Sequence, residues 1–147
     1  MPQSQTRPAD EFMDAEATAA PPAAILNLTQ HPASPAQIAA GVVDLTGVEL
    51  SDLKVALNFA APPTALQIEC SMETVTYLCG RHKAAAAMVG GAPWLMAFLE
   101  RALRRAGVRP LYAFSQRPSP DRPFEHICFV DVTALERGLS PAWRDRG

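Results

Sequence analysis

This chain of 147 residues contains one stretch that decides its fold, Ile25-Leu26-Asn27-Leu28-Thr29-Gln30-His31-Pro32-Ala33-Ser34-Pro35-Ala36-Gln37. An apolar run ends in polar residues, and the start of a helix follows at once. Ser34 is a favourable N-cap, Pro35 suits the first helical position, and Gln37 lies where a capping box needs it. A strand that leads directly into a helix is typical of an α/β unit, and such sheets bind ligands outside the carboxyl ends of their strands. Thr29, Gln30 and His31 are therefore predicted to lie where a ligand would bind.

The composition narrows the classes of protein to consider. Apolar residues make up 48% of the chain, which is enough for the core of one domain. The net charge of −2 argues against non-specific binding of duplex nucleic acid, although a small anionic ligand could still bind in a local basic pocket. Cys70, Cys79 and Cys128 are too few and too scattered for a disulfide framework, so reduced thiols are expected. Without a signal peptide or an apolar run of membrane-spanning length, the sequence predicts a cytoplasmic protein that does not contact a membrane.

The distribution of residue types predicts three parts. Residues 1–22 are rich in Pro, Ala, Gln, Asp and Glu without apolar periodicity, which is typical of a disordered leader. Residues 23–134 are expected to form one Rossmann-like α/β domain, and residues 135–147 a short helical turn and a polar C-terminal tail. The domain should begin with a buried strand over Ile25–Thr29, followed by a helix from about Pro35 into residues 38–43.

The middle of the chain predicts two helices. Residues 44–61 fit both the alternation of a strand and the spacing of a helix, and we favour a short helix with Ser51 as a possible cap. Pro62 and Pro63 break the chain, after which Thr64 can cap a helix that runs to about His82.

The second half predicts strands separated by one strong helix. Ala84–Val89 is uniformly small and apolar, as in a central strand that is buried on both faces. A helix should run from Pro93 to a stop at Gly107, with strands over Pro110–Ser115 and Glu125–Val132 after it. The short connection makes the last strand antiparallel to its predecessor. The expected fold is therefore α/β, with a mainly parallel sheet and a C-terminal antiparallel hairpin.

Three strand ends would converge in such a sheet, and their chemistry suits a phosphate-bearing ligand. Glycines allow a backbone to approach closely, the start of a helix attracts anions, and an arginine offers a forked cation. A histidine can act as acid, base or hydrogen-bond donor, and hydroxyl and amide groups can bind hydroxyls or base edges. The candidate ligand-binding residues are Thr29, Gln30, Gly90, Gly91, Ser115 and Arg117, and the candidate catalytic residue is His31.

Each candidate also has a purely structural interpretation. Gly90-Gly91 can be a tight turn between strand and helix, and it is not a Walker or dinucleotide motif. His31 can shape the turn before Pro32, and Arg117 can be a solvated loop charge. Asn27 is better explained as a strand residue that ties neighbouring loops together than as a catalyst.

Two other kinds of site are not supported by the sequence. Cys70, Cys79 and His82 have poor spacing for a metal and offer three ligands where structural zinc needs four. Ser115 and His31 lack a motif such as the nucleophile elbow, so a catalytic triad is not expected. We expect neither a metal nor a cofactor.

An opening strand Ile-Leu-Asn-Leu-Thr, followed by His-Pro and a helix that begins with proline, resembles the small CARF-like proteins of type III CRISPR systems. The resemblance covers Ile25–Pro32, Gly90–Arg105 and Gly107–Val132. The last two ranges include a Gly-x-x-Pro start to a strand and a proline-rich hairpin. The chain also resembles uncharacterised phage and mobile-element proteins that share the Leu-Thr-Gln-His-Pro opening and the Gly-Gly-Ala-Pro turn.

The CARF-like family includes ring nucleases and binders of cyclic oligoadenylate. The resemblance therefore implies a homodimer that holds a cyclic oligonucleotide over its strand ends. It leaves open whether the ligand is only bound or is also cleaved, and cleavage in such proteins needs no metal and proceeds by attack of a ribose 2′-hydroxyl. The leader and the long central helix have no counterpart in that family, and no lysine lies near the predicted site in the sequence. Two other functions stay open, which are a non-catalytic sponge or interaction module and an enzyme that acts on an ordinary nucleotide.

Overall fold

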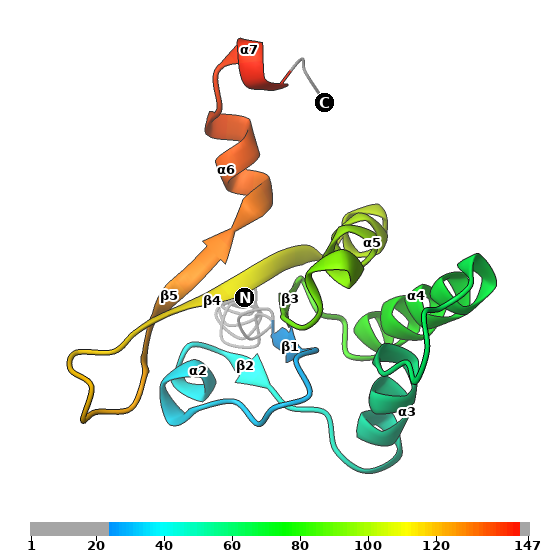
Figure 1. The fold of residues 1–147 in the computed structure, drawn as a ribbon, viewed down its shortest axis with the longest axis horizontal. Coiled ribbons are helices and arrows are strands. Elements are labelled where there is room, and N and C mark those ends of the chain that lie inside the picture. Colours follow the sequence, from blue (N-terminus) through cyan, green and yellow to red (C-terminus); the bar gives the residue numbers. More distant parts are fainter. Residues whose placement is uncertain (1–23, 145–147) are drawn as a thin grey trace, which may run out of the picture.

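The computed structural model describes residues 24–144, and the predicted leader over residues 1–22 lies outside them. The chain forms one five-stranded sheet, and helices connect most of its strands along the sequence (Figure 1). The elements are β1 (Ile25–Asn27), α2 (Pro35–Ala39), β2 (Val42–Val43), α3 (Gly47–Leu57), α4 (Ala65–Arg81), β3 (Ala86–Val89), α5 (Pro93–Arg105), β4 (Arg109–Gln116), β5 (Glu125–Asp131), α6 (Val132–Gly138) and α7 (Pro141–Arg144).

The strand order in the sheet is β2-β1-β3-β4-β5. The pairs β1–β2, β1–β3 and β3–β4 are parallel, and β4–β5 is antiparallel, as the sequence predicts. The chain goes from β1 outward to β2 and then returns past β1 to β3, so its direction across the sheet reverses between β1 and β3. In open α/β sheets, ligands bind at the carboxyl ends of the strands where the chain reverses in this way.

The core lies between the sheet and helices α3, α4 and α5, which gather on one side of it in Figure 1. Each of the three helices has apolar residues at intervals of three and four, which lie on one face of the helix. This face packs against side chains from β1 and β3. The fully enclosed members include Leu26, Leu53, Val75, Ala87 and Leu99. Within residues 24–144, no helix is long and apolar enough to cross a membrane.

Helix starts follow the predicted caps. Ser34 and Gln37 form a reciprocal capping box on α2, and Thr64 and Gln67 form another on α4. The short helix expected within residues 44–61 is confirmed as α3, but Thr46 and not Ser51 occupies its N-cap position.

The first predicted helix is too long. Helix α2 ends at Ala39, and Val42–Val43 form strand β2 instead of continuing the helix. Gly41 takes a φ of 106°, which an L-amino acid avoids, and its carbonyl accepts a hydrogen bond from the Ile25 amide at 3.0 Å. This bond starts the parallel pairing of β1 with β2.

The C-terminal helices are more extensive than one turn. Asp131 caps α6 through Oδ1, which accepts from the amides of Thr133 and Ala134. The guanidinium of Arg104 on α5 lies 3.0 Å from the carboxylate of Glu136 on α6. The predicted boundary between residues 134 and 135 therefore falls inside a helix that is attached to the domain.

Candidate functional site

The candidate site lies where β1 and β3 end side by side. Asn27 and Met88 are partners in the sheet, so the residues that follow them leave the sheet together. A Cβ placed on Gly90 would lie 3.5 Å from Cγ2 of Thr29, so the two predicted site segments are close neighbours. The structure therefore brings Thr29 and Gly90 to one edge of the sheet.

The loop after β1 is held by the buried side chain of Asn27, which is 5% exposed. Its Nδ2 donates to the carbonyl oxygen of His31 at 2.7 Å and to Oδ1 of Asp44 at 2.8 Å. Its Oδ1 accepts from the amide of Thr29 at 2.9 Å and from the Thr29 hydroxyl at 2.7 Å. Asp44 also accepts from the amide of Ala33. The prediction that Asn27 ties neighbouring loops together is confirmed.

Gln30 stands in a conformation that few residues adopt. Its φ is 68°, in the left-handed region, which costs about 1–3 kcal/mol for a residue other than glycine. The Gln30 Oε1 accepts from Nδ2 of Asn58 at 2.7 Å, and the same Nδ2 donates to the carbonyl of Lys54. The loop after β1 is thus bonded to the end of α3, and Asn58 is a contact that the sequence did not indicate.

A recess of about 120 Å³ opens beside His31. Drug-sized ligands occupy pockets of roughly 300–1,000 Å³, so the recess can take a single small group while the rest of a ligand lies over the edge of the sheet. Lys54, on α3, lines the same recess as His31, although the two residues are far apart in the sequence. The lining residues are Asn27, Gln30, His31, Pro32, Asp44, Leu45, Leu50 and Lys54.

The turn after β3 leads into helix α5 through Gly90 and Gly91. Gly91 has a φ of 138°, which requires glycine, and the N-cap residue Ala92 has no side chain to bond the first-turn amides. Pro93 has no N–H group, and the Leu95 amide donates to the carbonyl of Ala92 at 3.0 Å, so the donors that this turn can offer to an anion are the amides of Gly91, Ala92 and Trp94. The ring of Trp94, on the first turn, lies 5.9 Å from that of Phe59, so the α3–α4 loop flanks this turn.

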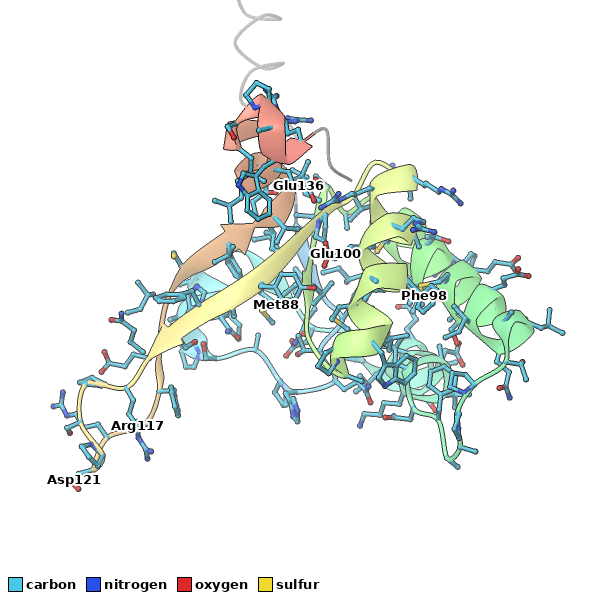
Figure 2. The ribbon with its side chains drawn as sticks, turned by 45° about the horizontal axis from the view of Figure 1, so that its top comes forward. Met88, Phe98, Glu100, Arg117, Asp121 and Glu136 are labelled. Carbon is cyan, nitrogen blue, oxygen red and sulfur yellow. The ribbon has the colours of Figure 1, made fainter. Side chains whose placement is uncertain are left out.

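Ser115 and Arg117 do not join this edge. Val89, the last residue of β3, pairs with Tyr112, and β4 then continues to Gln116. At about 3.3 Å per residue, Arg117 stands roughly 16 Å beyond the edge along the strand. Figure 2 shows Arg117 near the tip of the hairpin, where its Nε donates to the carbonyl of Arg122 and its guanidinium lies 5.3 Å from the centre of the Phe124 ring.

Titratable groups elsewhere are explained by packing. Burial raises the pKa of the Cys79 thiol to about 11. Burial also raises the pKa of Tyr112, and so does the hydrogen bond that its hydroxyl donates to Glu100 at 2.7 Å. His82 lies 3.0 Å from the carboxylate of Glu49. Across residues 24–144, no group of three or more His, Cys, Asp or Glu residues is placed to hold a metal ion.

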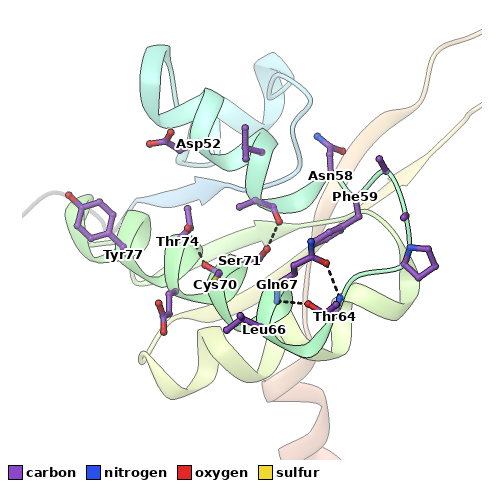
Figure 3. A pocket seen from close by; sticks show the side chains of 16 residues that line it. Asp52, Asn58, Phe59, Thr64, Leu66, Gln67, Cys70, Ser71, Thr74 and Tyr77 are labelled. Atoms are coloured by element: carbon purple, nitrogen blue, oxygen red, sulfur yellow. Dashed lines mark hydrogen bonds between the residues drawn. The ribbon is translucent and has the colours of Figure 1, made fainter.

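A second hollow, of about 1180 Å³, lies between α3 and α4 (Figure 3). Three of its polar side chains are bonded within the chain: the Ser71 hydroxyl donates to the carbonyl of Ala56 at 2.6 Å, and Thr64 and Gln67 bond one another. Asp52 and Glu73 add negative charge to its lining. This groove therefore offers less to an anionic ligand than the edge between β1 and β3.

Comparison with known proteins places the chain in a family without giving it an activity. No curated protein matches the chain. No solved structure matches it either. A family model described as the uncharacterized protein MJ1673 family matches residues 23–129, which is more than half of the chain and runs from before β1 to within β5. The chain therefore belongs to the MJ1673 family.

Proposed function

We propose that this protein binds a cyclic oligoadenylate second messenger at the edge between β1 and β3, in the cytoplasm, as part of type III CRISPR defence between phage and host. The observation that carries the proposal is that Thr29 and Gly90 lie next to one another at the reversal point of the sheet. The resemblance to CARF-like proteins supplies the class of ligand. Nothing in the family match names a ligand.

The local chemistry supports an anionic ligand. A phosphate that approaches Gly90 and Gly91 would meet the amides of Gly91, Ala92 and Trp94 without a glycine side chain in the way. Lys54 can add positive charge from the recess on the other side, which His31 also lines. The negative charge of Asp44 is engaged by the amide of Ala33 and by Asn27, which reduces its repulsion of a phosphate.

Cleavage would use the ligand's own nucleophile. A ribose 2′-oxygen attacks the adjacent phosphorus, the bond from phosphorus to the 5′-oxygen breaks, and a 2′,3′-cyclic phosphate forms. In our proposal His31 accepts the proton of the 2′-hydroxyl, and water protonates the departing 5′-oxygen. Fixing the two reacting atoms in line and stabilising the charged phosphorane are the contributions that a protein makes to such a step.

We also propose that the protein works as a homodimer. We propose that Ser115 and Arg117 contact a cyclic ligand that is large enough to extend from the edge between β1 and β3 toward the hairpin of β4 and β5. Their position makes them selective for a large ligand, because a single nucleotide at the edge would not reach them.

The experiment is a binding and product assay with a panel of cyclic and linear oligonucleotides. Calorimetry should show binding of a cyclic oligoadenylate in preference to linear oligonucleotides and mononucleotides. Mass spectrometry of the same mixtures should show a product with a 2′,3′-cyclic phosphate. Tight binding without product over hours rejects cleavage and leaves a sponge. Failure to bind any member of the panel rejects the proposed function altogether.

A further inference from the structure

An apolar groove of about 730 Å³ runs between α4 and α5 on the surface of the molecule. Ile68, Met72 and Ala102 contribute to its lining, together with two large aromatic side chains that stay exposed. Trp94 is 48% exposed and Phe98 is 44% exposed. Figure 2 shows Phe98 between the two helices. Large exposed aromatic side chains gathered in one groove are typical of a surface that binds another protein.

The two walls of this groove carry opposite charges. Glu69 and Glu73 stand one turn apart on α4, and Arg101 and Arg105 stand one turn apart on α5. All four are exposed. Among the described residues none of the four takes part in an ion pair, whereas the neighbouring Arg104 is bonded to Glu100 and Glu136. The walls therefore present charge that the chain itself does not neutralise.

We propose that a second copy of this chain covers the groove, with a two-fold axis that runs along it. In a two-fold interface the same surface patch of both copies meets, so the patch must be complementary to itself. If one residue of the first copy contacts a second residue of the other copy, the reverse contact is made as well. An axis along the groove lays α4 of each copy over α5 of the other. Glu69 and Glu73 of each copy then face Arg101 and Arg105 of the other copy. An axis across the groove would set acid against acid and base against base.

This interface deepens the proposed function and rests on the homodimer proposed there. Trp94 lies on the first turn of α5, directly after Gly90 and Gly91, so one end of the groove meets the candidate site. Rotation about an axis along the groove keeps both of these ends on the same side of the dimer. The two candidate sites would then lie together, where one cyclic ligand with two-fold symmetry can contact both.

Charge reversal tests the interface and the direction of its axis. We expect sedimentation velocity to show a wild-type dimer at about 50 μM, and to show that Glu69→Lys with Glu73→Lys weakens it by about tenfold or more, because like charges then oppose one another. Arg101→Glu with Arg105→Glu should do the same. Combining all four changes in one chain should restore the dimer, and so should mixing the two double variants. Asp121→Lys with Glu125→Lys on the hairpin is the matched control, and it should leave association unchanged.

The outcomes separate the interface from the dimer itself. A wild type that is monomeric at every concentration overturns both. A dimer that survives each double reversal overturns this interface alone, as does a fourfold variant that stays monomeric while its circular dichroism and melting temperature match the wild type. Ligand binding by calorimetry on the same samples tests the nucleotide proposal independently, because affinity per chain is read separately from association.

Discussion

Nδ2 of Asn27 donates a 2.8 Å hydrogen bond to Oδ1 of Asp44, and these two side chains together hold residues 29–33 at the carboxyl end of β1. Asn27 is the last residue of β1, and Asp44 directly follows β2, the neighbour of β1 in the sheet. The loop that carries Thr29 and His31 is therefore attached at two points to the rigid sheet, as a binding site requires.

Asn27→Asp should destabilise the protein by about 3 kcal/mol at pH 7. The change removes both donated hydrogen bonds and places a second carboxylate against Asp44 in a buried position. Urea unfolding measures the loss, which should shrink as the pH falls and one of the two carboxyls is protonated. Asn58→Asp, at the exposed C-cap of α3, is the control. A loss below about 0.5 kcal/mol for Asn27→Asp would show that the network does not hold the loop.

The Cys79 thiol gives a pH dependence whose sign follows from its raised pKa. Its pKa rises from 9.0 to about 11 on folding, so the folded state holds this proton more tightly. The stabilisation is complete below pH 9 and is lost as the pH rises toward 11. Between pH 9 and 11, the free energy of unfolding should fall less in Cys79→Ala than in the wild type, by roughly 1–3 kcal/mol over that range. An equal slope in variant and wild type would contradict the assignment, and Cys70→Ser is the exposed control.

His31→Ala should separate catalysis from binding. If His31 accepts the 2′-hydroxyl proton, its loss removes an interaction made mainly in the transition state, and turnover should fall by roughly 10²–10⁴-fold while affinity changes much less. Single-turnover kinetics and calorimetry on the same preparation measure the two effects. Parallel losses of stability and affinity would assign His31 to the turn before Pro32 instead.

Arg117→Ala should weaken binding of a cyclic oligoadenylate by about 1–3 kcal/mol, the usual loss for a charge-assisted hydrogen bond. It should leave the affinity for a mononucleotide and the melting temperature nearly unchanged, because the guanidinium stands on the hairpin beyond the edge and contacts Phe124 and Arg122. Competition calorimetry provides both affinities. An unchanged affinity for the cyclic oligoadenylate would show that Arg117 is a solvated loop charge that does not contact the ligand.

Local signals made much of the fold predictable. The capping boxes of Ser34 and Thr64 place two helix starts, and the uniformly apolar Ala86–Val89 marks the central strand, because these features depend on residues close in sequence. Strand β2 was missed because two residues carry no periodicity. Its pairing depends instead on the conformation of Gly41 and on a distant partner, Ile25.

The site was only partly predictable for a related reason. Thr29 and Gly90 follow the ends of adjacent parallel strands, and topology alone brings them together. The strand over Pro110–Ser115 was predicted, but β4 runs past the end of β3 and pairs there with β5 alone, which carries Ser115 and Arg117 away. This register between strands has no local signal in the sequence. Lys54 and Asn58 reach the site through the packing of α3, so spacing in the sequence gave no indication of either residue.

The location of the ligand is the central claim, and amide chemical shifts of isotope-labelled protein test it most directly. Titration with a cyclic oligoadenylate should move the amide signals of Thr29, Gln30 and His31 together with those of Gly90, Gly91 and Ala92. Signals from the groove between α3 and α4, such as those of Gln67 and Thr74, should stay in place. Saturation that moves only the groove signals, or that moves none, would contradict a binding site between β1 and β3.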